Sequence, residues 1–201
     1  MSKIICVSNR KLCNENFLIR IEKICKCKPD AIILREKDME ESEYEKLAIK
    51  VNEICTTYGV PCYLHSFCQT AIKLGVNNIH LPLSILEQTD SMLLKAFNHI
   101  GTSCHSVEDV KKAQQLGCTY AIAGHIFETD CKKGLEPRGI SFLEDVCKNS
   151  AIPIFAIGGI TKDNIGQINK TGTNGVCIMS GMMTCSNPEI MMAELKHSSV
   201  W

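Results

Sequence analysis

The sequence predicts an α/β protein folded as a (β/α)8 TIM barrel, a single compact domain over residues 1–201. Three observations lead to this fold class. Short apolar runs rich in Ile, Val and Leu recur eight times, and longer segments with helical spacing lie between them. Eight units in 201 residues leave about 25 residues each, which suits a compact barrel. No low-complexity segment or linker divides the chain.

The eight apolar runs are the predicted strands, at 3–8, 31–36, 61–65, 78–81, 99–103, 120–124, 153–159 and 175–181. Helical spacing is clearest at 41–59 and at 106–117, where Ser106 with Asp109 predicts a helix start and Gly117 a helix end. Strands that alternate with helices must pair in parallel, because each crossover returns the chain to the same end of the sheet. An open doubly wound sheet is the alternative, but it seldom has eight evenly spaced strands, and the chain has no G-x-G-x-x-G.

Composition excludes some functional classes. The chain has 22 Lys and Arg against 22 Asp and Glu, so the formal net charge is zero. General nucleic-acid or anionic-membrane binding rests on excess positive charge, and we expect neither partner. The N-terminus has no signal-peptide pattern, and no apolar run approaches the roughly 18 residues of a membrane span. A cytoplasmic location is expected, and a local site for a small phosphate remains possible.

The thirteen cysteines form no spaced framework. Their number is odd, they are scattered through predicted strands and helices, and no C-x-x-C pair occurs; the closest approach is Cys25 and Cys27. A disulfide scaffold or structural zinc site needs better spacing. We interpret them as small buried thiols in a reducing compartment.

A barrel predicts where function lies, because active sites form where strands end and βα loops begin. Polar residues and glycines gather at those points. They are Arg35, Glu36 and Lys37; His65 and Ser66; Ser103 and His105; residues 125–133; Gly158 and Gly159; and Ser180 and Gly181.

Glycines follow the seventh and eighth predicted strands, at Gly158 and Gly159 in "AIGGI" and at Ser180 and Gly181 in "IMSGMM". Glycine lets backbone N–H groups approach a ligand, and a following helix start attracts anions. The loops after strands seven and eight of such barrels are a frequent phosphate site. We predict phosphate binding there; the alternative is that these glycines only make tight turns.

Arg35 and Lys37 in "LREKD" form a basic pair at the end of the second predicted strand. Such a pair can hold a second anionic group, for example a carboxylate or a pyrophosphate. The alternative is a salt-bridge network with Glu36 and Asp38.

Histidine is the side chain best suited to moving protons near neutral pH. His99 and His197 are predicted at the surface, and His80 in "NIHL" in the interior. The residues alone leave His65, His105 and His125 tied. No pair of carboxylates stands out at the ends of strands two to five, so a magnesium site, which needs one or two carboxylates, is not predicted.

Six motifs in this order resemble the thiamine phosphate synthase and TenI superfamily over nearly the whole chain. They are "ILREKD", "AIKLGVNNIHL", "IGTSCHSVEDV", "GHIFETDCKKG", "IPIFAIGGI" and "GVCIMSG". The resemblance implies a small (β/α)8 barrel that acts on thiazole phosphates in thiamine biosynthesis.

The superfamily has two main branches. The synthases couple a hydroxymethylpyrimidine diphosphate to the thiazole phosphate, with magnesium neutralising the leaving pyrophosphate. Their "N-D-R" and "G-Q-E-D" motifs carry the metal-binding aspartates. Here the first reads His65-Ser66-Phe67 and the second Pro82-Leu83-Ser84-Ile85, and Ile33 replaces a glutamine that precedes the arginine. Without those aspartates the charge neutralisation that such chemistry needs is missing.

"GHIFETDCKKG" resembles the other branch, the TenI-type thiazole tautomerases, which have a histidine after the glycine where synthases usually have proline. The resemblance implies a metal-free isomerisation with His125 as base and acid, and no cofactor. It implies phosphate contacts from Gly158, Gly159, Ser180 and Gly181, and thiazole-side contacts from Lys132 with Thr129. The role of Arg35 and Lys37 stays open, and His105 is expected to shape the mouth.

Two alternatives remain: a thiamine phosphate synthase that recruits other Mg²⁺ ligands, and a non-catalytic TenI-like regulatory protein that binds thiazole phosphate. A homodimer is possible in either case.

Overall fold

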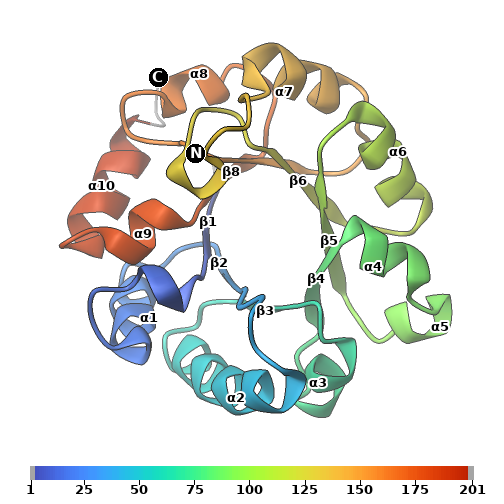
Figure 1. Ribbon diagram of the computed structural model, residues 1–201, viewed down its shortest axis with the longest axis vertical. Helices are drawn as coiled ribbons and strands as arrows, with labels where there is room; N and C mark the ends of the chain where they lie inside the picture. The colour runs from blue at the N-terminus through green and yellow to red at the C-terminus, as the bar shows by residue number, and fades with distance from the viewer. Residues whose placement is uncertain (1–2, 199–201) are drawn as a thin grey trace.

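The computed structural model describes residues 3–198 and shows a closed barrel of eight parallel strands surrounded by helices (Figure 1). The strands pair in chain order, and β8 closes the barrel on β1 with Lys3 opposite Gly175. The strands are β1 Lys3–Val7, β2 Ala31–Leu34, β3 Cys62–His65, β4 Asn78–Pro82, β5 His99–Cys104, β6 Tyr120–Gly124, β7 Ile154–Ile157 and β8 Gly175–Ile178. The predicted fold class is confirmed.

Helices connect successive strands on the outside of the barrel (Figure 1). The α-helices are α1 Phe17–Lys26, α2 Glu41–Thr57, α3 Cys68–Lys73, α4 Leu83–Gln88, α5 Ser91–Leu94, α6 Val107–Gln115, α7 Gly139–Lys148, α8 Ile165–Ile168, α9 Ser180–Thr184 and α10 Pro188–Ser198. Two 3₁₀ turns, η1 Arg10–Leu12 and η2 Asp130–Lys132, lie in the loops after β1 and β6.

Strand and helix positions agree with the sequence pattern, but several strands end earlier than predicted. β2 ends at Leu34, β7 at Ile157 and β8 at Ile178, so Arg35, Gly158 and Ser180 lie beyond the strands. The start of α6 is as predicted, because the Ser106 hydroxyl accepts the Asp109 N–H at 3.0 Å. Gly117 ends that segment with a φ of +84°, which favours glycine.

Apolar side chains form two layers. Alternate strand residues face outward against the helices, and Ile4, Ile32 and Leu34 of this layer are essentially unexposed. The other residues fill the barrel interior: Ile5, Val7, Ala31, Ile33, Tyr120, Ile122, Phe155 and Cys177. Burying a large apolar side chain contributes about 1.5–3 kcal/mol. The part of the barrel interior that these residues fill is therefore packed core, and any cavity must lie beyond it, at one end of the barrel.

Two tyrosines shape the interior. The Tyr120 ring lies against the backbone of Gly101, where a Cβ would come within 3.0 Å of the ring. Tyr44 of α2 donates its hydroxyl to the Leu34 carbonyl at 2.7 Å and accepts the His65 N–H at 2.8 Å. Tyr44 thus ties β2 and β3 together at their carboxyl ends, next to the loop that carries Arg35.

All thirteen cysteines have free thiols, and eight of them are buried. Burial raises the pKa of the Cys104 and Cys118 thiols to about 12, so these remain protonated. Their interpretation as small core residues is confirmed for these eight, whereas Cys131 is exposed. Within residues 3–198, no helix is long and apolar enough to span a membrane.

Candidate active site

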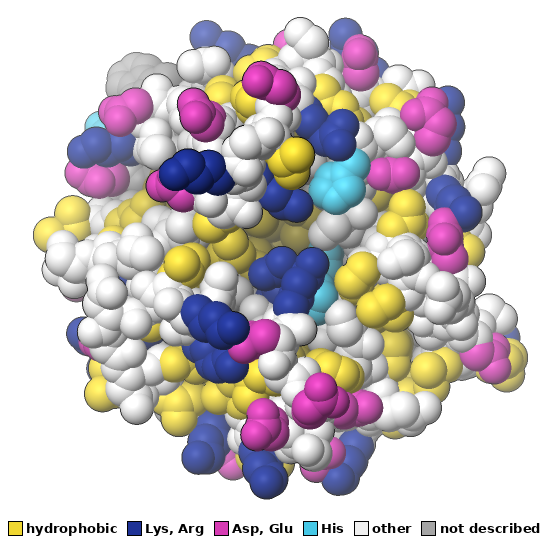
Figure 2. Space-filling view, in the orientation of Figure 1, with side chains coloured by type: hydrophobic (Ala, Val, Ile, Leu, Met, Phe, Trp, Pro, Cys, Tyr) yellow, Lys and Arg dark blue, Asp and Glu magenta, His cyan; other side chains and the backbone are white. Residues whose placement is uncertain are grey.

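A cavity of about 600 Å³ opens at the carboxyl ends of the strands. Figure 2 shows it as a hollow with an apolar floor, with basic and histidine side chains around it. Glu36 and Ser66 do not line this cavity, whereas the residues predicted to be catalytic or substrate-binding all do: His125, Arg35, Lys37, Thr129, Lys132, Gly158, Gly159, Ser180 and Gly181. The concentration of polar residues at strand ends therefore did locate one pocket.

The glycine loops form one wall of the cavity. Gly158 has a φ of +106° and Gly159 a φ of +65°, values that favour glycine. A Cβ at Gly159 would come within 3.0 Å of the Glu128 carbonyl oxygen, and the Asn164 amide donates to the Gly159 carbonyl at 2.8 Å. Ser180 and Gly181 begin α9, whose first N–H groups lack intrahelical acceptors. This wall presents backbone suited to an anion.

His125 directly follows β6, through a cis peptide bond after Gly124, and is 9% exposed. Its Nε2 lies 3.3 Å from the carbonyl oxygen of Leu135. Because a carbonyl only accepts, Nε2 carries the hydrogen in this contact, and the lone pair of the neutral ring is on Nδ1. The Arg138 N–H donates to the His125 carbonyl at 3.0 Å, so the β6–α7 loop folds back over the histidine.

His65 and His80 stack with their ring centroids 5.8 Å apart. His80 is held between the Tyr120 hydroxyl and the Ser103 hydroxyl, each at 3.0 Å, as a satisfied interior residue. Burial lowers the pKa of His65 to about 2 and that of His80 to about 3, aided by the nearby positive charge of Arg35. Both rings are uncharged at neutral pH.

His105 is exposed, and its Nδ1–H donates to the Gly124 carbonyl at 2.8 Å. Because His65 stays uncharged, His105 and His125 remain as the candidates for the histidine that moves a proton. Both lie at the carboxyl end of β6. His99 and His197 are exposed, as predicted.

Three cations surround the cavity mouth. Burial lowers the pKa of the half-buried Arg35. Burial also lowers the pKa of Lys37, and the positive charges of Arg35 and Lys132 lower it further. Lys37 is thus close enough to Arg35 and to Lys132 to be repelled by both, and an anion beside it would relieve that repulsion.

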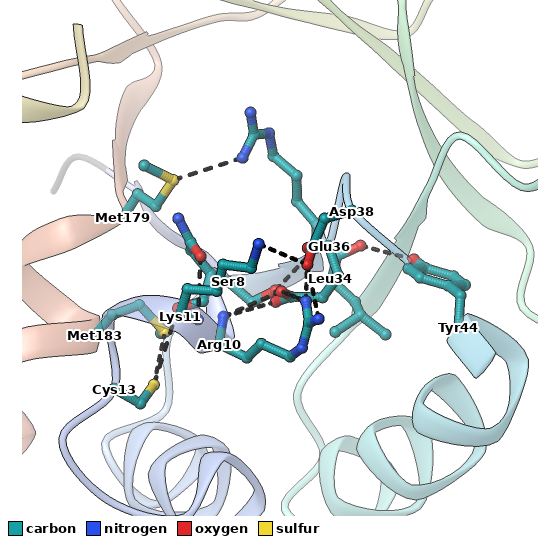
Figure 3. Close-up of polar contacts among 12 residues, drawn as sticks. Ser8, Arg10, Lys11, Cys13, Leu34, Glu36, Asp38, Tyr44, Met179 and Met183 are labelled. Atoms are coloured by element: carbon teal, nitrogen blue, oxygen red, sulfur yellow. Dashed lines mark hydrogen bonds and ion pairs between the residues drawn. The ribbon is translucent and has the colours of Figure 1, made fainter. Parts of the chain in front are cut away.

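The carboxylates of "LREKD" are bound elsewhere (Figure 3). Glu36 is buried and accepts the Ser8 hydroxyl at 2.7 Å and the Arg10 guanidinium at 3.1 Å. Asp38 pairs with Arg10 at 2.6 Å and with Lys11 at 2.8 Å, and Arg10 holds the pKa of that carboxyl well below its usual range. Glu36 and Asp38 form a salt-bridge network with Arg10 and Lys11 of the β1–α1 loop, so the alternative in which they pair with Arg35 and Lys37 is wrong for the ion pairs of the described residues.

Ser8 and Arg10 were not among the residues predicted from the sequence. The signal available was the polar run "SNRK" directly after the first predicted strand. Ser8 is unexposed, and its hydroxyl oxygen also accepts the Arg35 N–H at 2.8 Å. The first βα loop therefore sets the position of Arg35.

The donor set of the cavity does not fit Mg²⁺, which prefers carboxylates with substrate phosphates. Of the described residues that line it, Asp109 alone carries a carboxylate, and this accepts the His105 N–H at 2.6 Å. No cluster of three or more His, Cys, Asp or Glu side chains across residues 3–198 is arranged to hold a metal ion.

Comparisons with known proteins agree with this architecture. The family model TMP-TENI, described as thiamine monophosphate synthase, matches residues 4–182. The thiamine-phosphate synthase of Methanobrevibacter smithii is 30% identical over 190 residues, covering 94% of this chain and 91% of the relative. That of Fusobacterium nucleatum is 32% identical over 185 residues, covering 90% and 89%.

A solved structure of thiamine phosphate pyrophosphorylase from Pyrococcus furiosus has a TM-score of 0.83 with 22% identity. The match covers 98% of this chain and 95% of the pyrophosphorylase chain, and it shows a shared fold. With a family model over residues 4–182 and relatives at 30% identity or more along most of its length, the chain belongs to the thiamine monophosphate synthase (TMP-TENI) family.

Proposed function

We propose that this enzyme of thiamine biosynthesis is a TenI-type thiazole tautomerase, a metal-independent isomerase that aromatises a carboxythiazole phosphate. The observation that carries the proposal is the pairing of His125 in the cavity with the lack of a carboxylate set for magnesium among the described lining residues. An isomerisation by proton transfer needs a base and a phosphate anchor, and it needs no metal to neutralise a leaving group.

The substrate is a non-aromatic carboxythiazole phosphate with an exocyclic double bond. Its phosphate binds at the wall formed by Gly158, Gly159, Ser180 and Gly181, which leaves the ring beside His125. Nδ1 removes the proton from the ring carbon that bears the carboxylate, and the electron pair moves through the ring to the exocyclic carbon. That carbon takes the proton from Nδ1, so the step is balanced. The product ring is aromatic, which drives the reaction.

The contact between His125 and the Leu135 carbonyl suits a proton shuttle. It holds Nε2–H in place while Nδ1 gains and loses a proton, and it stabilises the imidazolium that forms in between. A histidine that keeps one nitrogen protonated presents the same base at the start and the end of the cycle.

Synthase activity is the second candidate, favoured by the relatives, which are thiamine-phosphate synthases by name. It requires a leaving pyrophosphate to be neutralised, and the cations Arg35, Lys37 and Lys132 offer part of that charge. The cavity lacks the carboxylate donors that would hold magnesium beside them, as far as the described residues go. We therefore rank it below the tautomerase.

One experiment separates these functions. The protein is incubated with the thiazole tautomer in EDTA and, separately, in Mg²⁺, and aromatisation is followed by absorbance. We expect equal rates in both, and a loss of about 10²–10⁴-fold in His125→Asn, the size typical of a general acid–base group. His125→Asn should still bind the aromatic carboxythiazole phosphate product, and His197→Asn, at the exposed face of α10, serves as the control.

Full activity in His125→Asn would show that the base is another group. Magnesium-dependent release of pyrophosphate from the two synthase substrates, without aromatisation of the tautomer, would establish the synthase instead. Binding of thiazole phosphate with neither reaction would favour a non-catalytic, regulatory protein.

A further inference from the structure

We propose that Arg35, assisted by Lys37, forms a carboxylate-binding subsite that selects the carboxylated thiazole phosphate over the same molecule without its carboxylate. This inference rests on the proposed function and assigns the second anionic group of its substrate. The cavity wall built from the glycine loops accounts for the phosphate, and the carboxylate needs a partner of its own.

The position of Arg35 supports this subsite. Arg35 is half-buried in the cavity, and among the described residues no carboxylate lies within ion-pair distance of it or of Lys37. Its guanidinium nitrogen Nη1 lies 3.9 Å from the sulfur of Met179, which is a weak acceptor. The charge of Glu36 acts on this guanidinium from a distance but forms no ion pair with it. A partly desolvated guanidinium without an ion-paired carboxylate gains substantially when one arrives, since it has already lost part of its hydration.

The neighbouring acids cannot act as the partner of Arg35. Glu36 directly follows Arg35, but its carboxylate receives the Ser8 hydroxyl and the backbone N–H and guanidinium of Arg10. Ser8 in turn accepts the Arg35 N–H, which fixes the backbone that presents the side chain. The loop is thus built to hold an arginine at the cavity while satisfying the local carboxylate elsewhere.

The groups around the Arg35 guanidinium also favour binding of a carboxylate. His65 and His80, which feel the charge of Arg35, are uncharged, so they neither compete for the anion nor add positive charge. Lys37 and Lys132 add charge from the β2 and β6 loops. A single carboxylate would meet one planar guanidinium suited to two parallel hydrogen bonds, with ammonium groups nearby.

Such a subsite also fits the chemistry. Removal of the proton from the carbon beside the carboxylate pushes electron density toward the carboxylate oxygens. A guanidinium held there stabilises the transition state more than the ground state, and so raises the rate as well as the affinity.

The test uses a matched ligand pair, the aromatic carboxythiazole phosphate and the thiazole phosphate that lacks the carboxylate, titrated calorimetrically. We expect the wild-type protein to prefer the carboxylated ligand by about 10- to 100-fold, the range of one charge-assisted bidentate contact. Arg35→Gln should abolish most of this preference and leave affinity for the decarboxylated ligand within about threefold.

Three variants accompany it. Lys37→Gln should reduce the preference less than Arg35→Gln, and Arg35→Lys should restore part of it because the charge returns without the planar fork. Lys162→Gln is the control, since Lys162 is not among the residues that line the cavity and forms an exposed ion pair with Glu194. If Arg35→Gln does not fold, as judged by its melting transition, Arg35→Lys and Lys37→Gln still report on the subsite.

Equal weakening of both ligands by Arg35→Gln would place the arginine on the phosphate and overturn the inference, as would a wild-type protein without any preference. Binding needs no turnover, so the two proposals fail separately. A preference that Arg35→Gln removes, in a protein that does not convert the tautomer, would keep the subsite and reject the tautomerase. Conversion of the tautomer by a protein that shows no preference between the two ligands would keep the tautomerase and reject the subsite.

Discussion

Gly158 lies directly against His125, so closely that a Cβ built on Gly158 would come within 3.0 Å of the Cβ and Cα of the histidine. The two residues follow neighbouring strands, β7 and β6, at the point where both enter the cavity. The glycine therefore serves two purposes at once: it lines the proposed phosphate wall, and it leaves room for the proposed base.

Gly158→Ala should displace His125 and lower kcat at least about tenfold, since a misplacement near 1 Å can cost about 10²-fold. It should also reduce the free energy of unfolding by about 1–3 kcal/mol through strain at positive φ. Activity assays and urea denaturation measure the two effects.

Gly117→Ala is the matched control, because Gly117 also has a positive φ but meets no atom within 4 Å. It should share the loss of stability and keep the wild-type kcat. If both variants lose activity alike, the effect of Gly158→Ala is general strain and its contact with His125 is irrelevant.

His65 and His80 make the protein sensitive to acid. Their pKa values in the folded state, about 2 and about 3, lie below the ordinary histidine value of 6.5, so the unfolded chain binds protons first as the pH falls. The stability from these uncharged rings is fully present above about pH 6.5 and is lost as the pH falls toward 3. The loss approaches about 1.4 kcal/mol per pH unit for each ring.

Urea denaturation at pH 7, 5.5 and 4.5 measures this slope. His65→Gln should reduce the slope of the free energy of unfolding against pH by the contribution of about one proton. His197→Gln, at an exposed position, should leave this slope unchanged. An unchanged slope in His65→Gln would mean that carboxylates alone account for the acid sensitivity.

The strands were predictable because eight apolar runs at regular spacing reflect burial, and burial dominates the pattern. Strand ends were not, since Arg35 and Gly158 leave the strands through loop geometry that local composition does not encode. The Arg10–Glu36 contact joins residues 26 apart, and it depends on the register that sets Val7 opposite Ile33. His80 could be placed in the interior from its apolar neighbours, but its partner Tyr120 is 40 residues away.

Glu36 should matter for stability far more than its neighbour Asp38, although both pair with Arg10. Glu36→Ala leaves the buried Ser8 hydroxyl and Arg10 N–H without their acceptor, and breaking such a buried pair costs about 3–5 kcal/mol. Chemical denaturation checks this value, and Asp38→Asn, at an exposed position, is the control with little expected change.

Glu36→Gln keeps the shape and removes the charge. It should weaken binding of the carboxylated ligand, because the chain from Glu36 through Ser8 to the Arg35 N–H holds that loop in place. If Glu36→Ala were as stable as the wild type, Arg10 and Ser8 would have found other partners. The Glu36 carboxylate would then not be what fixes this loop.

Alkylation of the Cys131 thiol should inactivate the enzyme. Cys131 is exposed and lines the cavity between Thr129 and Lys132, whereas most other thiols are buried and protonated. Iodoacetamide should label it at least about tenfold faster than the buried cysteines, because reactivity follows exposure and thiolate content. Mass spectrometry of peptides over time, measured beside residual activity, tests this.

The added acetamide group would occupy space at the cavity mouth, so modification of Cys131 and inactivation should proceed at the same rate. Excess carboxythiazole phosphate should slow both equally by filling the cavity. Cys131→Ser, compared with its own untreated rate, should resist inactivation. If the serine variant is inactivated as fast as the wild type, another thiol is responsible, and the cavity mouth tolerates a substituent at position 131.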